Sequence, residues 1–124
     1  MNNLSIRLDF YNINNRVCLI ADQGREPYGK ITANLPDFDL EPNEFFVKTY
    51  SENAGWAEPL LKQHPNLFQE QSDKGVMFNG LYFPCYKLTN KFIAEEFEKT
   101  YNSRSDIYEA PQPLWDLYGK YCEV

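Results

Sequence analysis

Short runs rich in apolar residues recur through the first 35 positions of the chain, and turn-forming residues separate these runs. From Leu4 to Tyr11 every second side chain is apolar, which is the pattern of a half-buried strand. The runs Arg16–Ala21 and Tyr28–Leu35 predict two more strands, because turn residues at 12–15 and 22–24 precede them. Three short strands joined by tight turns predict an antiparallel meander.

Further strands are predicted in the middle of the chain. Glu44–Thr49 is rich in Phe and Val and predicts a fourth strand, whereas the polar stretch Asn66–Lys74 is expected to be an irregular loop. Asn79 and Gly80 lie between two apolar runs, and an Asn-Gly pair in that setting is the strongest short-range signal for a β-hairpin. Pro84 makes the outgoing arm of this hairpin an edge strand or a bulge.

Three segments predict helices: Trp56–Gln63, Lys91–Tyr101 and a last short helix that Pro113 can open. Polar residues able to cap the first two helices precede them: Ser51 or Asn53 before the first, and Thr89 or Asn90 before the second. The elements together predict an α+β fold, in which an antiparallel sheet of about five to six strands carries two or three helices packed mainly on one face.

The length of 124 residues predicts a single domain, residues 1–124. We expect its core within residues 1–101. Residues 102–124 then form a proline-containing C-terminal extension that ends in the short aromatic helix.

Trp115, Tyr118 and Tyr121 recur at helical spacing in that last helix, and the stripe permits two interpretations. Such a stripe usually packs one helix face on the core. Trp and Tyr are also enriched in interface hot spots, so the same residues can mediate self-association, including formation of a homodimer.

The segment Pro36–Glu58 concentrates the charge of the chain. It carries six carboxylates against one base, Lys48, which gives it a local charge of −5 in a chain whose net charge is −6. The carboxylates are those of Asp37, Asp39, Glu41, Glu44, Glu52 and Glu58. The remainder of the chain is therefore close to neutral, and the electrostatic field of the protein arises mainly from this segment.

Two interpretations of the acidic segment stay open. A run of charge is usually a solvated loop that aids solubility. Alternatively, the six carboxylates bind a partner, because one negative surface can meet a protein that grips phosphates with Lys and Arg. Carboxylates at strand spacing lie about 7 Å apart on one face, so such a surface would imitate a nucleic-acid backbone.

Residue types that carry catalysis or bind metals are sparse. His64 is the one histidine, it directly precedes a proline at an expected helix end, and no nucleophile can be assigned to it. The three cysteines have neither metal-ligand nor redox spacing. The run of acids at 37, 39, 41 and 44 lacks the central glycine and the distal glutamate of a calcium-binding loop. We therefore expect no catalytic residues, no bound metal and no cofactor.

The charge and hydropathy of the chain predict its setting. The net charge of −6 predicts no direct binding to nucleic acid, which requires a basic footprint. No run approaches the roughly 20 apolar residues that span a bilayer, and the N-terminus lacks the pattern of a signal peptide. Because unpaired cysteines suit a reducing compartment, we expect a cytoplasmic protein without membrane contact.

A resemblance covers part of the chain. The stretch Glu26–Leu61 contains the strand GKITANLPDFDL and the run PNEFFVKTYSENAGWAEPLL, and the segment GLYFPCYKL follows later. In these features the chain resembles a family of small uncharacterised proteins carried on conjugative and phage-like mobile elements of gut bacteria, in which GLYFPCYKL is similar to the closing strand. The helix from Lys91 and the tail from Asn102 look like an extension. The resemblance supplies no functional residue; it implies a setting, since accessory proteins of mobile elements often act in transfer, regulation or evasion of host defence.

Charge, aromatic content and this resemblance lead to one expected function and two alternatives. We expect a non-enzymatic acidic protein-binding module of a mobile element, which inhibits a nucleic-acid-handling protein of host defence as anti-CRISPR and antirestriction proteins do. The first alternative is a small enzyme or small-molecule-binding domain with a cleft on the aromatic face of the sheet. The second is a self-associating structural accessory protein.

Overall fold

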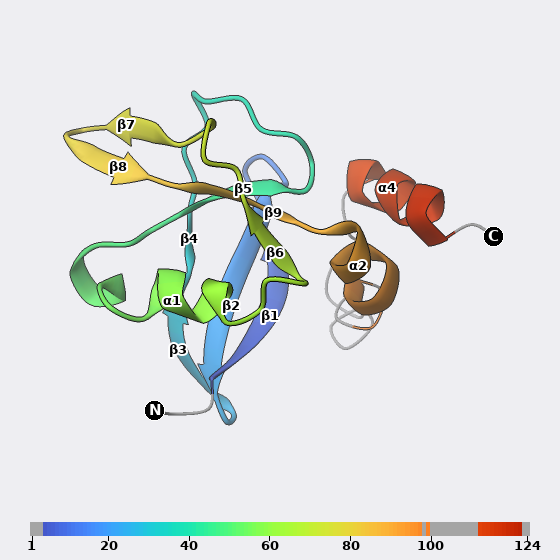
Figure 1. Ribbon diagram of the computed structural model, residues 1–124, viewed down its shortest axis with the longest axis horizontal. Helices are drawn as coiled ribbons and strands as arrows, with labels where there is room; N and C mark the ends of the chain where they lie inside the picture. Colours follow the sequence, from blue (N-terminus) through green and yellow to red (C-terminus); the bar gives the residue numbers. More distant parts are fainter. Residues whose placement is uncertain (1–3, 98, 100–111, 123–124) are drawn as a thin grey trace.

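The computed structural model of the protein describes residues 4–97, 99 and 112–122 (Figure 1). In this part of the chain nine strands form antiparallel sheets, and helices accompany them. The predicted α+β fold is confirmed. The strands are divided among sheets of three, four and two strands, whereas the sequence pattern predicted one sheet of five to six.

The predicted N-terminal meander is formed by β1 (Leu4–Phe10), β2 (Val17–Gln23) and β3 (Glu26–Lys30). Leu8 of β1 lies opposite Leu19 of β2, and both side chains are buried. Asn15 and Gly24 have positive φ in the two turns, a conformation that asparagine and glycine adopt more readily than other residues. Alternation therefore predicted β1 and its buried face, and the apolar run after Arg16 predicted β2. The predicted strand Tyr28–Leu35 is instead divided between β3 and β4, which lie in different sheets, and most of β3 is exposed.

The four-stranded sheet has the order β4-β5-β9-β6 and consists of β4 (Thr32–Ala33), β5 (Glu44–Val47), β6 (Phe68–Glu70) and β9 (Cys85–Leu88). The prediction of an irregular loop over Asn66–Lys74 is wrong at its centre, where β6 pairs with β9. In β6 only Phe68 is buried, and the next two residues are exposed. One buried residue gives no alternation, so the sequence pattern could not reveal this strand.

The two-stranded sheet is the hairpin predicted from Asn79 and Gly80. Its strands are β7 (Val76–Phe78) and β8 (Leu81–Phe83). Asn79 has a φ of 54° and Gly80 a φ of 79°, and a two-residue type I′ turn requires positive values at both positions. Figure 1 shows the hairpin extending away from the other sheets.

Two strands continue from one sheet into the next without a loop. Between β3 and β4, the N–H of Ile31 donates to Leu19 (2.8 Å) and its carbonyl accepts from Lys48 (2.9 Å). Between β8 and β9, the carbonyl of Pro84 accepts from the N–H of Val47 (2.9 Å). These continuous strands hold the sheets together.

The main core lies between the two larger sheets and includes side chains from the helices. The helical segments are the 3-10 helix η1 (Ser51–Asn53), α1 (Ala57–Lys62), α2 (Asn90–Phe92), the π-helix η2 (Ile93–Phe97) and α4 (Gln112–Cys122). Leu19 and Phe45 from the sheets form one buried cluster with Leu61 of α1, Phe97 of η2 and Leu114 of α4. The helix predicted over Lys91–Tyr101 therefore begins as α2 and continues as η2, while residues 98, 100 and 101 lie outside the described part.

The predicted helix caps have different outcomes. Thr89 caps α2, because its hydroxyl accepts a hydrogen bond from the N–H three residues later (3.2 Å). The predicted cap of α1 is wrong: its N-cap residue is Trp56, which makes no side-chain bond there. The amide of Asn53 is buried and donates instead to the carbonyls of Lys30 (2.7 Å) and Lys48 (3.0 Å). Asn53 thus links the end of β3 to the segment after β5.

Cys18 and Cys85 are free, buried thiols in β2 and β9. Burial raises the pKa of the Cys85 thiol to about 11. The folded protein therefore holds this proton more tightly than the unfolded chain, whose thiol has a pKa of 9.0, and its stability falls as the pH rises from that value.

Because the thiolate is the reactive form, we expect iodoacetamide at pH 8 to alkylate Cys85 at least about 100-fold more slowly in the folded protein than in urea. Mass spectrometry of the peptide that carries Cys85 measures both rates, and the urea sample is the control. Equal rates would contradict the buried position of this thiol.

Candidate protein-interaction surface

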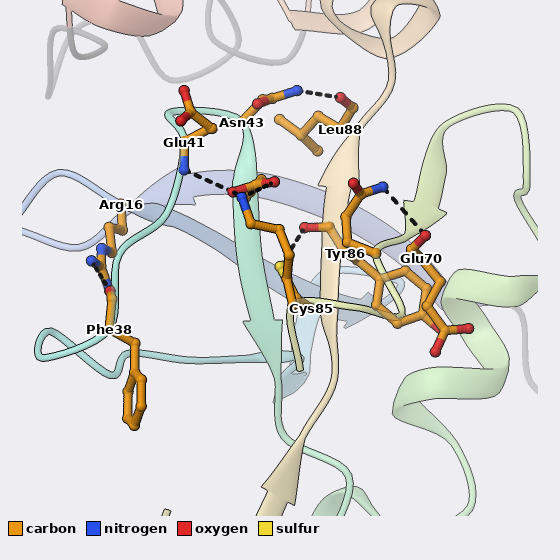
Figure 2. A network of polar contacts seen from close by, with 11 residues as sticks. Arg16, Phe38, Glu41, Asn43, Glu70, Cys85, Tyr86 and Leu88 are labelled. Atoms are coloured by element: carbon orange, nitrogen blue, oxygen red, sulfur yellow. Dashed lines mark hydrogen bonds and ion pairs between the residues drawn. The ribbon is translucent and has the colours of Figure 1, made fainter. Parts of the chain in front are cut away.

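Residues 34–43, here called the acidic loop, connect β4 to β5, and contacts from the turn between β1 and β2 hold this loop in place. The Arg16 guanidinium donates to the backbone carbonyls of Leu35 (2.7 Å) and Phe38, and Figure 2 shows Arg16 directed at Phe38. The side-chain amide of Asn14 donates to that of Asn34 (2.9 Å). The loop is therefore preorganised by contacts with the meander.

Asp37, Asp39 and Glu41 are the exposed carboxylates of the acidic loop. Within the described part of the chain, no ion pair involves any of these three side chains. In Figure 2 the carboxylate of Glu41 points away from the hydrogen-bonded network below it. Three of the six predicted partner-binding residues thus lie in one loop, and their carboxylates are exposed to solvent.

Glu44 lies in β5 and has a structural role. It is only 5% exposed, and its carboxylate accepts hydrogen bonds from the ammonium of Lys74 at 2.7 and 2.9 Å. A third bond comes from the backbone N–H of Glu41 (2.8 Å). The bond to Glu44 raises the pKa of Lys74. The Glu44 carboxylate is therefore satisfied inside the protein.

Glu52 and Glu58 are also engaged within the protein, at positions outside the acidic loop. Lys48 lies 2.6 Å from Glu52, and this hydrogen bond lowers the pKa of the glutamate to about 2. The Glu58 carboxylate accepts from the hydroxyl of Tyr86 (2.7 Å). Burial, and then Glu58, raise the pKa of Tyr86. Both carboxylates therefore have hydrogen-bond partners within the protein.

The β7–β8 hairpin exposes large apolar side chains that sequence analysis did not single out. Met77 is 62% exposed, Tyr82 47%, Phe78 37% and Leu81 36%. A sequence signal existed, because Gly75–Tyr86 contains no charged residue. The pattern alone did not reveal that the arms of this hairpin extend beyond the core.

The hairpin adjoins the acidic loop. The rings of Phe38 and Phe78 meet edge to face with centroids 6.0 Å apart. Asp37 lines the same small cavity, of about 60 Å³, as these two rings. Asp37, Phe38 and Phe78 therefore place the acidic loop beside the hairpin, and the loop and the hairpin together are here called the loop–hairpin surface.

A cavity of about 420 Å³ lies between the β1–β2 turn, the acidic loop and the first residues of α4. Its polar lining comes from Asn14, Asn15, Arg16, Glu41 and Gln112, and none of its lining residues is a histidine, cysteine or serine. It does not lie over the aromatic face of a sheet, where the small-molecule alternative placed its cleft.

Trp115 and Tyr118 of α4 contact the ring of Phe97, with centroids 4.9 and 5.7 Å away. Tyr121 is partly buried and packs against the same core. This geometry matches the core-packing interpretation of the aromatic stripe. Self-association through these residues stays a prediction.

The fold and this surface define a small α+β protein with an acidic loop beside an exposed apolar hairpin. Among the described residues, no group of three His, Cys, Asp or Glu is placed to hold a metal ion. No helix in the same part of the chain is long and apolar enough to cross a membrane. Comparison of the chain with protein-family models, with curated proteins and with solved structures gives no match.

Proposed function

We propose that this protein acts by binding a protein partner through the loop–hairpin surface and has no catalytic activity. The partner has a basic surface and handles nucleic acid, and binding inhibits it as part of the defence of a mobile element against its host. The observation that carries this proposal is the contact between Phe38 and Phe78, which places the acidic loop beside the exposed hairpin.

Charge and apolar area have different roles in such a surface. Exposed carboxylates increase the rate of association with a basic partner and disfavour acidic ones. Buried aromatic and methionine side chains supply most of the affinity at the centre of an interface. The Arg16 guanidinium donates to two backbone carbonyls of the acidic loop and so fixes its conformation. The loop therefore loses little conformational entropy when a partner binds.

The chemistry of the loop also supports the class of partner. A protein that binds phosphates with Lys and Arg presents the charges that Asp37, Asp39 and Glu41 would meet. The resemblance to accessory proteins of mobile elements supports host defence as the process. The net charge of −6 argues against nucleic acid as the direct partner.

Reversal of the three loop charges tests this proposal. We expect the triple variant Asp37→Lys, Asp39→Lys, Glu41→Lys to capture at least about 10-fold less partner protein from a lysate of the bacterial host at low salt, because repulsion replaces attraction. Quantitative mass spectrometry of the captured proteins at low and high salt measures the loss.

The matched control is the variant Glu26→Lys, Glu70→Lys, Glu95→Lys. It makes the same change in net charge at three exposed acids outside the loop–hairpin surface. We expect this control to capture the partner nearly as well as the wild type. Equal capture by the wild type and the loop variant at low salt would rule out the proposed function.

A further inference from the structure

The outer edge of β7 is open. Within the described residues β7 pairs with β8 alone. In a hairpin with a two-residue turn, the pair beside the turn, here Phe78 and Leu81, exchanges hydrogen bonds, and the next pair, Met77 and Tyr82, directs its backbone groups outward. The N–H and C=O of Met77 are therefore available to another strand.

β7 is short, but it lacks the other features that usually protect an edge strand. Natural edges carry charged side chains, prolines or bulges that prevent pairing with another chain. The run Gly75–Tyr86 contains no charge, and β7 itself contains no proline and pairs with β8 in regular register.

An apolar face accompanies this open edge. Met77 and Tyr82 are cross-strand neighbours and share the outer face of the hairpin. A Cβ at Gly75 would lie 2.0 Å from the Tyr82 hydroxyl, so the Tyr82 side chain lies directly over this glycine. An added strand would find both backbone partners and an apolar contact at the same place.

The charges around this edge select the partner. Asp37 lies beside Phe78, and Asp73 is exposed shortly before β7 begins. A second copy of this chain would bring the same carboxylates against them, whereas a segment with Lys or Arg would complement them.

We propose that an extended segment of the partner protein, with alternating apolar residues and flanking Lys or Arg, adds to the outer edge of β7 as a third strand. Backbone hydrogen bonds to Met77 supply affinity, while the acidic loop and the outer face of the hairpin select the sequence. This inference rests on the proposed function and specifies how the partner is bound.

Met77→Pro tests the hydrogen bond at the edge. The backbone N–H of Met77 points away from β8. Proline at this position therefore leaves the hydrogen bonds between β7 and β8 intact and removes the donor that an added strand needs. Met77→Ala is the matched control, because it also removes the methionine side chain but keeps the N–H.

The probe is a library of random ten-residue peptides displayed on phage and selected on the wild-type protein. We expect the selected peptides to be rich in Lys or Arg beside alternating β-branched residues. Synthesised singly, they should bind Met77→Pro at least about 10-fold more weakly than Met77→Ala in calorimetry. Failure to select any peptide, selection of peptides without basic residues, or equal binding by the two variants would overturn the proposal.

A second pair of variants covers the case in which Met77→Pro does not fold. Met77→Lys and Met77→Glu both keep the backbone donor and place side chains of opposite charge at the edge. We expect the selected peptides to bind the glutamate variant more tightly than the lysine variant. Equal binding of the peptides to the two variants would show that the segment is not basic. A dimer of the wild-type protein that the peptides dissociate would identify a second copy of the chain as the occupant of the edge.

Lysate capture separates this inference from the proposed function. If charge reversal in the acidic loop removes the partner while Met77→Pro and Met77→Ala capture it equally, the proposed function holds and docking on β7 is wrong. If neither the loop variant nor Met77→Pro reduces capture, both are wrong. If the loop variant and Met77→Pro both lose the partner while Met77→Ala still captures it, the proposed function and docking on β7 are both supported.

Discussion

Replacement of Asn53 by aspartate is expected to lower the free energy of unfolding by about 3 kcal/mol or more. The amide of Asn53 is 1% exposed and donates to two backbone carbonyls, those of Lys30 and Lys48. Aspartate has nearly the same shape but no N–H, so both carbonyls would lose their donor and would face a buried negative charge. Urea unfolding followed by far-ultraviolet circular dichroism measures the change.

Asn12→Asp is the control for this substitution, because it makes the same chemical change at an exposed position in the turn after β1. We expect it to change the free energy of unfolding by less than about 0.5 kcal/mol. A loss below about 1 kcal/mol for Asn53→Asp would show that the two carbonyl contacts do not hold these strands together.

Replacement of Lys74 by methionine is expected to cost about 2 to 3 kcal/mol of stability at neutral pH, because it leaves the buried carboxylate of Glu44 without its cation. The ammonium of Lys74 is the only cation in an ion pair with Glu44 among the described residues. Lys74 is itself partly exposed, so water would partly solvate the uncompensated charge, and the cost lies below that of a fully buried pair. Thermal and urea unfolding both report it.

The double variant Glu44→Gln, Lys74→Met completes the test. Because it removes the buried charge together with its partner, we expect it to be more stable than Lys74→Met alone. Lys62→Met is the control, since Lys62 is exposed and lies 3.9 Å from Glu58. Equal losses in Lys62→Met and Lys74→Met would show that the Glu44 pair contributes no more than a surface pair.

Local signals in the sequence predicted much of the fold. Alternation over Leu4–Tyr11 predicted β1, the pair Asn79 and Gly80 predicted the hairpin, and Thr89 predicted the start of α2. In each case the signal itself lies in residues that are close together along the chain. A pattern of neighbouring residues contains that information.

Contacts between distant residues could not be predicted in this way. Glu44 and Lys74 lie 30 positions apart, and nothing near either residue identifies the other. Asparagine often caps helices, which is why Asn53 was predicted to do so. Its side-chain amide donates instead to the carbonyl of Lys30, which lies 23 positions away in the sequence. The sequence also did not predict β6, because this segment is a strand only through its pairing with β9.

The same distinction applies to the candidate site. The six carboxylates looked alike in the sequence, and only burial and partners distinguish the exposed Asp37, Asp39 and Glu41 from the engaged Glu44, Glu52 and Glu58. The apolar half of the surface was missed because its residues have the composition of a core hairpin. Their exposure is a property of the tertiary arrangement.

The position of β9 in the four-stranded sheet determines when that sheet can form during translation. β9 is the last strand of the chain described and lies between β5 and β6, with Glu44 paired to Lys87. The ribosome therefore releases β5 and β6, the two neighbours of β9, before β9 itself, and each has an unpaired edge until residue 88 leaves the exit tunnel. The meander of β1, β2 and β3 needs no later strand for its own hydrogen bonds, so it can fold first and provide a surface on which the rest of the chain assembles.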